Sequence, residues 1–248
     1  MINNYPIIDI FEKKSKFSKL SSQMIYGEKF DIKRRYSNWL KIKTKYDSYE
    51  GFIKIKKFKK NFVPNYKIKS IKSLIYKKKN KKFIITKGYL PFASKVKIYS
   101  KYKDFYEFER NKWIKRNDLK KIGYINKDFV KIFKMFLNVK YKWGGKSFKG
   151  IDCSALLQIF FKFNNISIPR DTKDQVKFFK KNKNSFKFKK GNLIFWKGHI
   201  AICLNNKSLI HAYGPKKKVL IMQIVKTIEE IKNNAKLNKI KIKRINDY

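Results

Sequence analysis

The chain has 248 residues, of which 43% are hydrophobic, and this is enough to bury real cores and excludes a mainly disordered protein. Lysine and arginine number 64 against 17 acidic residues, a net charge of +47, but only six are arginine, the residue preferred for gripping phosphates and reading bases. The lysines are spread from end to end and are enriched together with Asn, Ile, Phe and Tyr, whose codons are A/T-rich, so we attribute most of the charge to genome composition. We expect weak, salt-sensitive association with nucleic acid and no specific nucleic-acid partner.

No run of about 18 apolar residues is present, and the N-terminus lacks a basic stretch followed by an apolar core. We therefore expect no membrane insertion, no conventional export signal and a cytoplasmic location. The two cysteines, Cys153 and Cys203, lie in unlike contexts and do not suggest a disulfide framework. The oligomeric state is not encoded in any pattern of this sequence.

After an N-terminal extension of residues 1–17, short β-rich runs alternate with turn signals over residues 18–63. Strands at such short spacing predict a small β-barrel. Its runs are 23–28, 30–33, 39–43 and 51–55. Residues 64–122 hold a linker and a second strand-rich segment, for which we predict a second, degenerate barrel.

A new domain is predicted over residues 123–248, because helical spacing of apolar residues begins after Asn126. Residues 153–163 have a dense apolar helix pattern, with Cys153 in the first turn. The later elements are β runs at 193–196, 199–204 and 208–213, a capping box at 227–230 that starts a helix, and a closing strand at 240–245. This order predicts an α+β fold in which helices pack on an antiparallel sheet.

Cys153 and the chain's only two histidines, His199 and His211, are a complete set of parts for nucleophilic acyl-transfer chemistry. The N-terminus of a helix favours the thiolate of a cysteine, and His199 would act as general base while His211 orients its ring. If residues 205–207 form the loop of an antiparallel hairpin, the two histidines point to one face as diagonal neighbours. A two-residue loop would place them on opposite faces.

A metal site built from the same three residues is the main alternative, although no short-spaced ligand pair such as Cys-x-x-Cys is present. We predict no metal and no cofactor. Cys203 lies between Ile202 and Leu204 and is interpreted as a core residue.

Five sequence blocks, in this order, resemble those of the NlpC-type cell-wall cysteine peptidases, which have a papain-like fold. The blocks are 141–145 (Tyr-Lys-Trp-Gly-Gly), 150–154 (Gly-Ile-Asp-Cys-Ser), 169–175 (Pro-Arg-Asp-Thr-Lys-Asp-Gln), 191–200 (Gly-Asn-Leu-Ile-Phe-Trp-Lys-Gly-His-Ile) and 209–212 (Leu-Ile-His-Ala). The segments before residue 123 resemble the bacterial SH3-like domains that precede the catalytic domain in the γ-D-glutamyl-L-diamino-acid endopeptidase subgroup. The resemblance is strong after residue 139 and weak between 64 and 122.

This resemblance implies a bacterial thiol hydrolase of murein peptide recycling or turnover. It would cut the bond between γ-D-glutamate and diaminopimelate or lysine in peptidoglycan stem peptides, through a Cys153 thioester. Tyr141 would lie near the oxyanion site. In relatives that need a free N-terminal L-alanine, the substrate-binding positions match Asp152, Ser154, Asp171 and Thr172, with Tyr49 and Glu28 from the SH3-like domain.

Other interpretations remain open beside this one. Asp171 equally fits an ion pair with Arg170 or a helix N-cap. Ala155, Asn192 and Ala201 stand where the family usually has Gly, Asp and Gly, but none of these departures removes a reacting group. A catalytically inactive peptidoglycan-binding protein is the alternative function.

Overall fold

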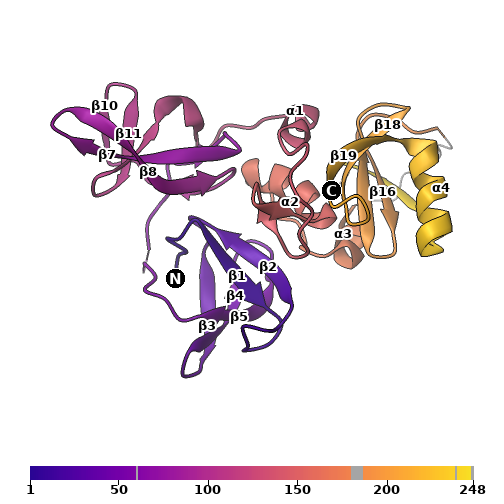
Figure 1. The fold of residues 1–248 in the computed structure, drawn as a ribbon, viewed down its shortest axis with the longest axis horizontal. Coiled ribbons are helices and arrows are strands. Elements are labelled where there is room, and N and C mark those ends of the chain that lie inside the picture. Colours follow the sequence, from indigo (N-terminus) through magenta and orange to yellow (C-terminus); the bar gives the residue numbers. More distant parts are fainter. Residues whose placement is uncertain (60, 180–186, 238, 247–248) are drawn as a thin grey trace. The chain divides into compact units, whose positions relative to one another are not determined.

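The computed structural model describes residues 1–59, 61–179, 187–237 and 239–246 (Figure 1). Contacts between residues divide the chain into two compact units. The first comprises Met1–Asn126, Lys146–Phe148 and Lys162–Ile166, and the second comprises Lys127–Gly145, Lys149–Phe161 and Ser167–Tyr248. The boundary is therefore not one cut in the sequence, because two short pieces from beyond residue 126 pack with the first unit.

The first unit begins with a five-stranded antiparallel sheet of order β2-β1-β5-β4-β3. Its strands are β1 (Ile7–Phe11), β2 (Leu20–Ile25), β3 (Phe30–Arg35), β4 (Trp39–Thr44) and β5 (Glu50–Lys54). Strand β4 shows why the segment folds this way, since Leu40, Ile42 and Thr44 alternate into the interior. Residues 1–17 are thus not an extension outside the fold, because β1 lies between β2 and β5. The run Ile7–Phe11 has only five residues and does not alternate apolar with polar side chains, so its sequence gives a weak strand signal.

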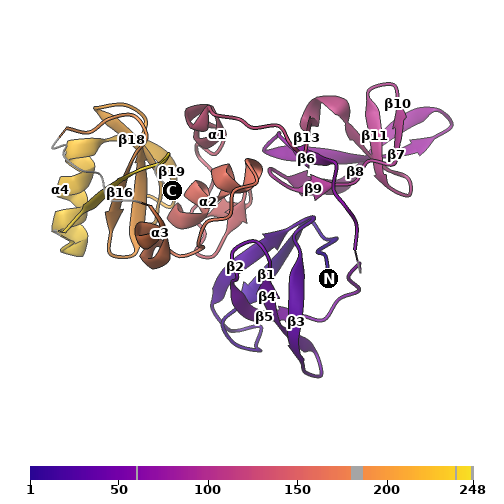
Figure 2. The same ribbon diagram turned by 180° about the vertical axis from the view of Figure 1, so that it is seen from behind.

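Two further sheets complete the first unit, in the orders β10-β11-β12-β7-β8 and β13-β6-β9 (Figure 2). Their strands are β6 (Tyr66–Ile68), β7 (Lys72–Lys79), β8 (Lys82–Pro91), β9 (Lys95–Val96), β10 (Ser100–Tyr102), β11 (Phe105–Glu109), β12 (Lys112–Lys115) and β13 (Leu119–Lys121), with a 3-10 turn at Arg116–Asp118. The segment 64–122 is strand-rich, as predicted.

The second unit is an antiparallel sheet of order β19-β18-β17-β16-β20 with helices on both faces (Figures 1 and 2). The predicted α+β class, helices packed on an antiparallel sheet, is confirmed. Its elements are α1 (Phe129–Lys134), β15 (Gly150–Ile151), α2 (Cys153–Phe163) up to Phe161, α3 (Thr172–Phe178), β16 (Asn192–Trp196), β17 (His199–Cys203), β18 (Ser208–Tyr213), β19 (Lys218–Gln223), α4 (Ile224–Ala235) and β20 (Lys241–Arg244). The short strand β14 (Lys146–Ser147) and the last two residues of α2 belong to the first unit.

Both faces of the second unit's sheet are buried. On one face, Ile224 and Ile231 of α4 share a core cluster with Ile194 and Leu209 of the sheet. On the other, Phe179 packs against Phe195 and against Phe161 of α2, with ring centroids 6.4 and 5.5 Å apart. Continuous burial along β16 explains the apolar run at residues 193–196.

The capping-box prediction at 227–230 is wrong. Helix α4 begins at Ile224, and the Thr227 hydroxyl donates a hydrogen bond to the Gln223 carbonyl, 2.7 Å away, within the first turn. A Thr hydroxyl bonds to the preceding turn as readily as to a helix N-terminus, so the local motif did not distinguish the two. Among the described residues, no helix is both long and apolar enough to cross a membrane.

Candidate active site

Cys153 is the first residue of α2, and its thiol is buried against the start of β17. Asp152 caps the helix by accepting the Ala155 N–H at 2.8 Å. The thiol sulfur lies 4.0 Å from the Gly198 carbonyl oxygen and makes backbone hydrogen bonds at Ile200 and Ser154. Burial, with a smaller effect of the Asp152 charge, raises the pKa of Cys153 to about 12. The resting nucleophile is therefore a thiol.

His199 and His211 contact one another at the centre of the site. Strands β17 and β18 pair Ile202 with Ile210 and Cys203 with Leu209, the register derived for a three-residue loop. The two rings accordingly share a face, and His199 Nε2 lies 3.0 Å from His211 Nδ1. Burial lowers the pKa of His199 to about 4 and that of His211 well below 6.5, so both imidazoles are neutral at physiological pH.

Two turns hold the histidine strands in place. Gly198 lies in the turn between β16 and β17 and has a φ of +80°, a conformation that glycine adopts without strain. This turn lets Trp196 pair with His199, the first residue of β17. At the other end of β17, the Asn205 side chain accepts the N–H groups of Lys207 and Ser208 at 2.8 and 2.7 Å. An Asn that bonds to the backbone ahead of it stabilises such a turn and so fixes the register.

Tyr141 lies near the nucleophile. Burial and the charges of Cys153 and Asp152 raise the pKa of its phenol, which therefore stays protonated and able to donate a hydrogen bond. Its backbone bridges to Ile151, two residues before Cys153. A neutral thiol, a neutral imidazole pair and a phenol donor can together perform nucleophilic attack on a carbonyl, with proton transfer to the histidine as the bond forms.

Asp152 and Ser154 form a buried network with Arg170, which was not among the predicted site residues. The Arg170 guanidinium makes two hydrogen bonds to the Asp152 carboxylate, at 3.0 and 2.6 Å, and a third to the Ser154 hydroxyl at 2.6 Å. Gly144 N–H donates to the second Asp152 oxygen at 2.9 Å. The ion pair that the structure shows for Arg170 is with Asp152, whereas the sequence left open one with Asp171. The sequence does contain one hint of this network, because Arg170 is an arginine in a chain whose cations are nearly all lysine.

Asp171 and Thr172 stand at the start of α3, and both are half-buried. Asp171 occupies the N-cap position, but its side chain makes no capping hydrogen bond. Burial raises the pKa of Asp171, while the nearby Arg170 charge opposes this. A half-exposed carboxylate without a capping role is suited to receive a cationic group.

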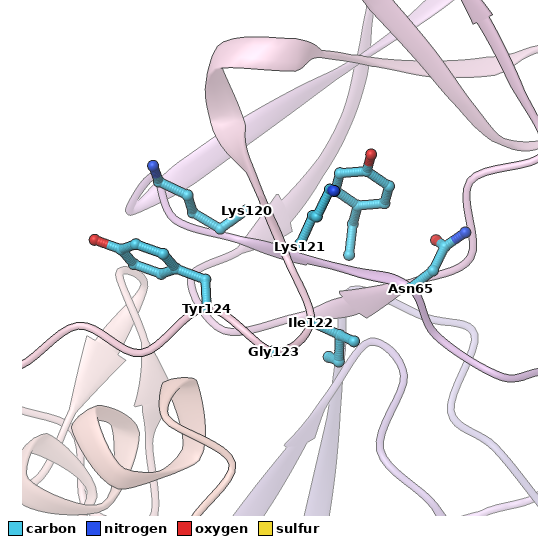
Figure 3. A pocket seen from close by; sticks show the side chains of 7 residues that line it. Asn65, Lys120, Lys121, Ile122, Gly123 and Tyr124 are labelled. Carbon is cyan, nitrogen blue, oxygen red and sulfur yellow. The ribbon is translucent and has the colours of Figure 1, made fainter.

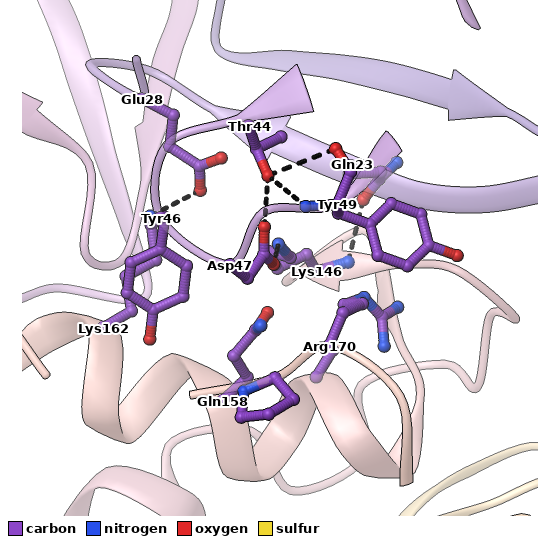
Figure 4. A network of polar contacts seen from close by, with 12 residues as sticks. Gln23, Glu28, Thr44, Tyr46, Asp47, Tyr49, Lys146, Gln158, Lys162 and Arg170 are labelled. Atoms are coloured by element: carbon purple, nitrogen blue, oxygen red, sulfur yellow. Dashed lines mark hydrogen bonds and ion pairs between the residues drawn. The ribbon is translucent and has the colours of Figure 1, made fainter. Parts of the chain in front are cut away.

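Tyr49 and Glu28 belong to the first unit and have internal partners there (Figure 4). Tyr49 packs against the core of the β1–β5 sheet, and its hydroxyl donates to the Ser21 carbonyl at 3.4 Å. Glu28 makes a buried ion pair with Lys162, 2.6 Å long, in which each side chain is 3% exposed. The Lys162 ammonium also lies 4.0 Å from the centroid of the Tyr46 ring.

A hollow of about 610 Å³ is also present in the first unit (Figure 3). Its described lining residues are Asn65, Tyr66, Lys120, Lys121, Ile122, Gly123 and Tyr124. The Lys120 ammonium lies 4.5 Å from the centroid of the Tyr124 ring, so these two side chains are partners of each other. None of the predicted site residues lines this hollow.

The metal alternative finds no support in the geometry. Over the part of the chain that the structure describes, no three His, Cys, Asp or Glu side chains are grouped to hold a metal ion. The two histidines instead face each other at hydrogen-bonding distance. Cys203 is fully buried in the core shared with α4, as predicted.

Known proteins match the second half of the chain. The model of the NlpC/P60 family matches residues 138–235. Over 111 residues the chain is 33% identical to the gamma-D-glutamyl-L-lysine dipeptidyl-peptidase of Bacillus subtilis (strain 168), covering 42% of this chain and 37% of that protein. Over 77 residues it is 36% identical to dipeptidyl-peptidase 6 of Lysinibacillus sphaericus, covering 31% of this chain and 28% of that protein. The matched regions thus span less than half of either relative.

The fold is similar over a longer stretch. The crystal structure of an NlpC/P60 family protein from Bacillus cereus superposes with a TM-score of 0.78, at 18% identity, over 90% of this chain and 93% of that one. This likeness concerns the fold, including the strand-rich first unit. The matched family model shows that residues 138–235 of this chain form an NlpC/P60 domain.

Proposed function

We propose that this protein is a cysteine peptidase acting on peptidoglycan stem peptides, and that it hydrolyses the bond between γ-D-glutamate and the following diamino acid, lysine or diaminopimelate. The observation that carries this proposal is the arrangement of Cys153 at the N-terminus of α2, beside the strand that bears His199 in contact with His211. The named activity of the B. subtilis relative supplies the bond and the substrate class.

The reaction follows from the neutral resting state of the site. As the Cys153 sulfur attacks the γ-carbonyl carbon of D-glutamate, its proton passes to His199, and the tetrahedral oxyanion accepts hydrogen bonds from the Cys153 backbone N–H and the Tyr141 phenol. His199 then gives the proton to the departing amine, which leaves a thioester. Water, deprotonated by the same imidazole, then attacks the thioester carbonyl. The bond from carbon to the Cys153 sulfur breaks, the sulfur takes the proton back from His199, and the γ-D-glutamyl product is released. His211 orients the ring of His199 throughout.

We propose that recognition includes a free N-terminal L-alanine. Asp171 and Thr172 would accept hydrogen bonds from its ammonium group, since their side chains are half-exposed and Asp171 has no capping role. Asp152 and Ser154 would contribute through Arg170, because all three are bound to each other in a buried network. We likewise propose that the first unit consists of SH3-like domains and that its residues Tyr49 and Glu28 contact the substrate.

A panel of peptides analysed by mass spectrometry tests three points together. These are which bond is cut, whether a free N-terminus is required, and whether lysine or diaminopimelate follows the glutamate. The protein should release L-Ala-γ-D-Glu from L-Ala-γ-D-Glu-L-Lys or its diaminopimelate counterpart, and should not cleave the N-acetylated peptide. Cleavage of the acetylated peptide at equal rate would remove the proposed role of Asp171. Binding of the peptides without any product would instead select the inactive wall-binding alternative.

A further inference from the structure

Both ring nitrogens of His211 have a partner. Nδ1 lies 3.0 Å from His199 Nε2, and on the opposite side of the ring Nε2 lies 3.3 Å from the sulfur of Met222. Strand β19 supplies Met222 from the position diagonal to His211, whose direct partner is Leu220. His211 is fully buried and its ring stacks on Tyr213, with centroids 4.6 Å apart. Among the residues that the structure describes, its partners in the ring plane are the imidazole on one side and the thioether on the other.

The thioether of Met222 determines which ring nitrogens of His211 and His199 carry a proton. A methionine sulfur carries no hydrogen and acts only as a weak acceptor, so His211 must present an N–H to it. A neutral imidazole has a single N–H, and this places the proton of His211 on Nε2. Nδ1 of His211 is then an acceptor, which requires His199 to donate from Nε2. The lone pair of His199 is consequently left on Nδ1.

We infer that Met222 is a positioning residue of this site: its sulfur sets the tautomer of His211, and through it the tautomer of His199, so that Nδ1 of His199 is the base for Cys153. This inference rests on the proposed function. With the opposite tautomers, Nδ1 of His199 would carry a proton and could not accept the proton of the attacking thiol.

Nitrogen-15 NMR of the full chain, labelled at histidine, tests the tautomers directly. The sequence has only two histidines, so four ring nitrogens account for the whole spectrum. At pH 7 we expect Nε2 of both rings to be protonated and Nδ1 of both to be unprotonated. A protonated Nδ1 on His211 would overturn the inference, and this reading does not depend on whether the protein hydrolyses any peptide.

Two variants of Met222 and one matched control test the role of the sulfur. Met222→Leu keeps the volume and removes the acceptor, so part of His211 should switch tautomer and kcat should fall roughly tenfold, with KM unchanged, the order expected when a buried donor loses its partner. Met222→Gln restores an acceptor and should recover both the spectrum and kcat. Met24→Leu, in the buried core of the first unit, should change neither.

The result that contradicts the role of Met222 is a Met222→Leu protein with the wild-type tautomers. If instead the tautomers change as expected while neither wild type nor variant cleaves any peptide, the inference holds and the proposed function fails. The two failures are therefore distinguishable.

Discussion

Cys153 and His199 are both neutral at rest, because burial raises the pKa of the thiol to about 12 and lowers that of the imidazole to about 4. We therefore expect no pre-formed thiolate and imidazolium pair in the resting site. The thiol must lose its proton as it attacks, and the histidine needs only to be unprotonated beforehand. Both requirements have consequences for the pH dependence of the reaction.

The acid limb of the pH profile should lie well below the ordinary histidine value. His199 accepts a proton only in its neutral form, and with a pKa of about 4 it is neutral at all higher pH values, so kcat/KM should stay flat from pH 7 down to about 5 and fall below that. Steady-state kinetics over this range check the expectation. An inflection near pH 6.5 would show that His199 has an ordinary pKa.

Reaction of Cys153 with iodoacetamide should be slow at neutral pH and should keep accelerating above pH 9. The reason is that the thiolate fraction of a thiol with a pKa of about 12 still grows tenfold per pH unit there. The measurement uses a Cys203→Ala background, which leaves a single thiol. A rate that levels off between pH 5 and 8 would reveal an ion pair and contradict this account.

We expect Arg170 to stabilise the fold itself, apart from any effect on substrate binding. Removing its guanidinium leaves the Asp152 carboxylate, whose side chain is 8% exposed, without a counter-charge. Arg170→Met should therefore lower the free energy of unfolding in urea by about 3 to 5 kcal/mol. Arg170→Lys keeps the charge and should cost less. An Arg170→Met protein of wild-type stability would mean that the network does not stabilise the fold.

At the scale of the element, the β17–β18 hairpin creates the histidine contact through its register. Three loop residues separate Leu204 from Ser208, and this odd number puts the two rings on one face. Deleting Asn206 should move His211 to the opposite face and abolish hydrolysis, whereas Asn206→Ala keeps the loop length and should retain activity. Product release by both variants, compared by mass spectrometry, decides the matter, and an active deletion variant would refute the role of the register.

Elements with strong local patterns could be predicted from the sequence. Residues 153–163 form α2 as expected, because apolar residues recur at helical spacing, and the hairpin register follows from counting loop residues. Strand β1 does not alternate apolar with polar residues, and Thr227 bonds within α4 instead of capping it. Arg170 meets Asp152 across 18 residues of sequence, and no local pattern encodes that contact. Met222 was likewise unforeseen, because the strand that carries it was not predicted.

At the scale of the whole molecule, two pieces of the chain beyond residue 126 belong to the first unit. Lys146 makes an ion pair with Asp47 at 3.5 Å, both side chains being 1% exposed, and Lys162 pairs with Glu28. Lys67, also buried, donates to the Phe163 carbonyl at 2.5 Å. Buried ammonium groups are costly without such partners. Buried ion pairs and a buried hydrogen bond therefore fix these two segments within the first unit.

Glu28 offers a test that separates a folding role from a substrate role. Glu28→Gln should destabilise the protein by about 3 kcal/mol, because it leaves Lys162 buried and unpaired. Glu28→Gln combined with Lys162→Met removes both charges and should recover most of the stability. If the double variant is stable but its KM rises, Glu28 contacts the substrate. If activity returns with stability, the residue acts only in the fold.

The central claim is that Cys153 is the nucleophile of a γ-D-glutamyl peptidase. Release of L-Ala-γ-D-Glu from L-Ala-γ-D-Glu-L-Lys and from its diaminopimelate counterpart, followed in time by mass spectrometry, tests it most directly. We expect one of the two peptides to be cut by the wild type and by the matched control Cys203→Ala, and neither to be cut by Cys153→Ala. Absence of this product from both peptides with the wild type, or its persistence with Cys153→Ala, would contradict the account.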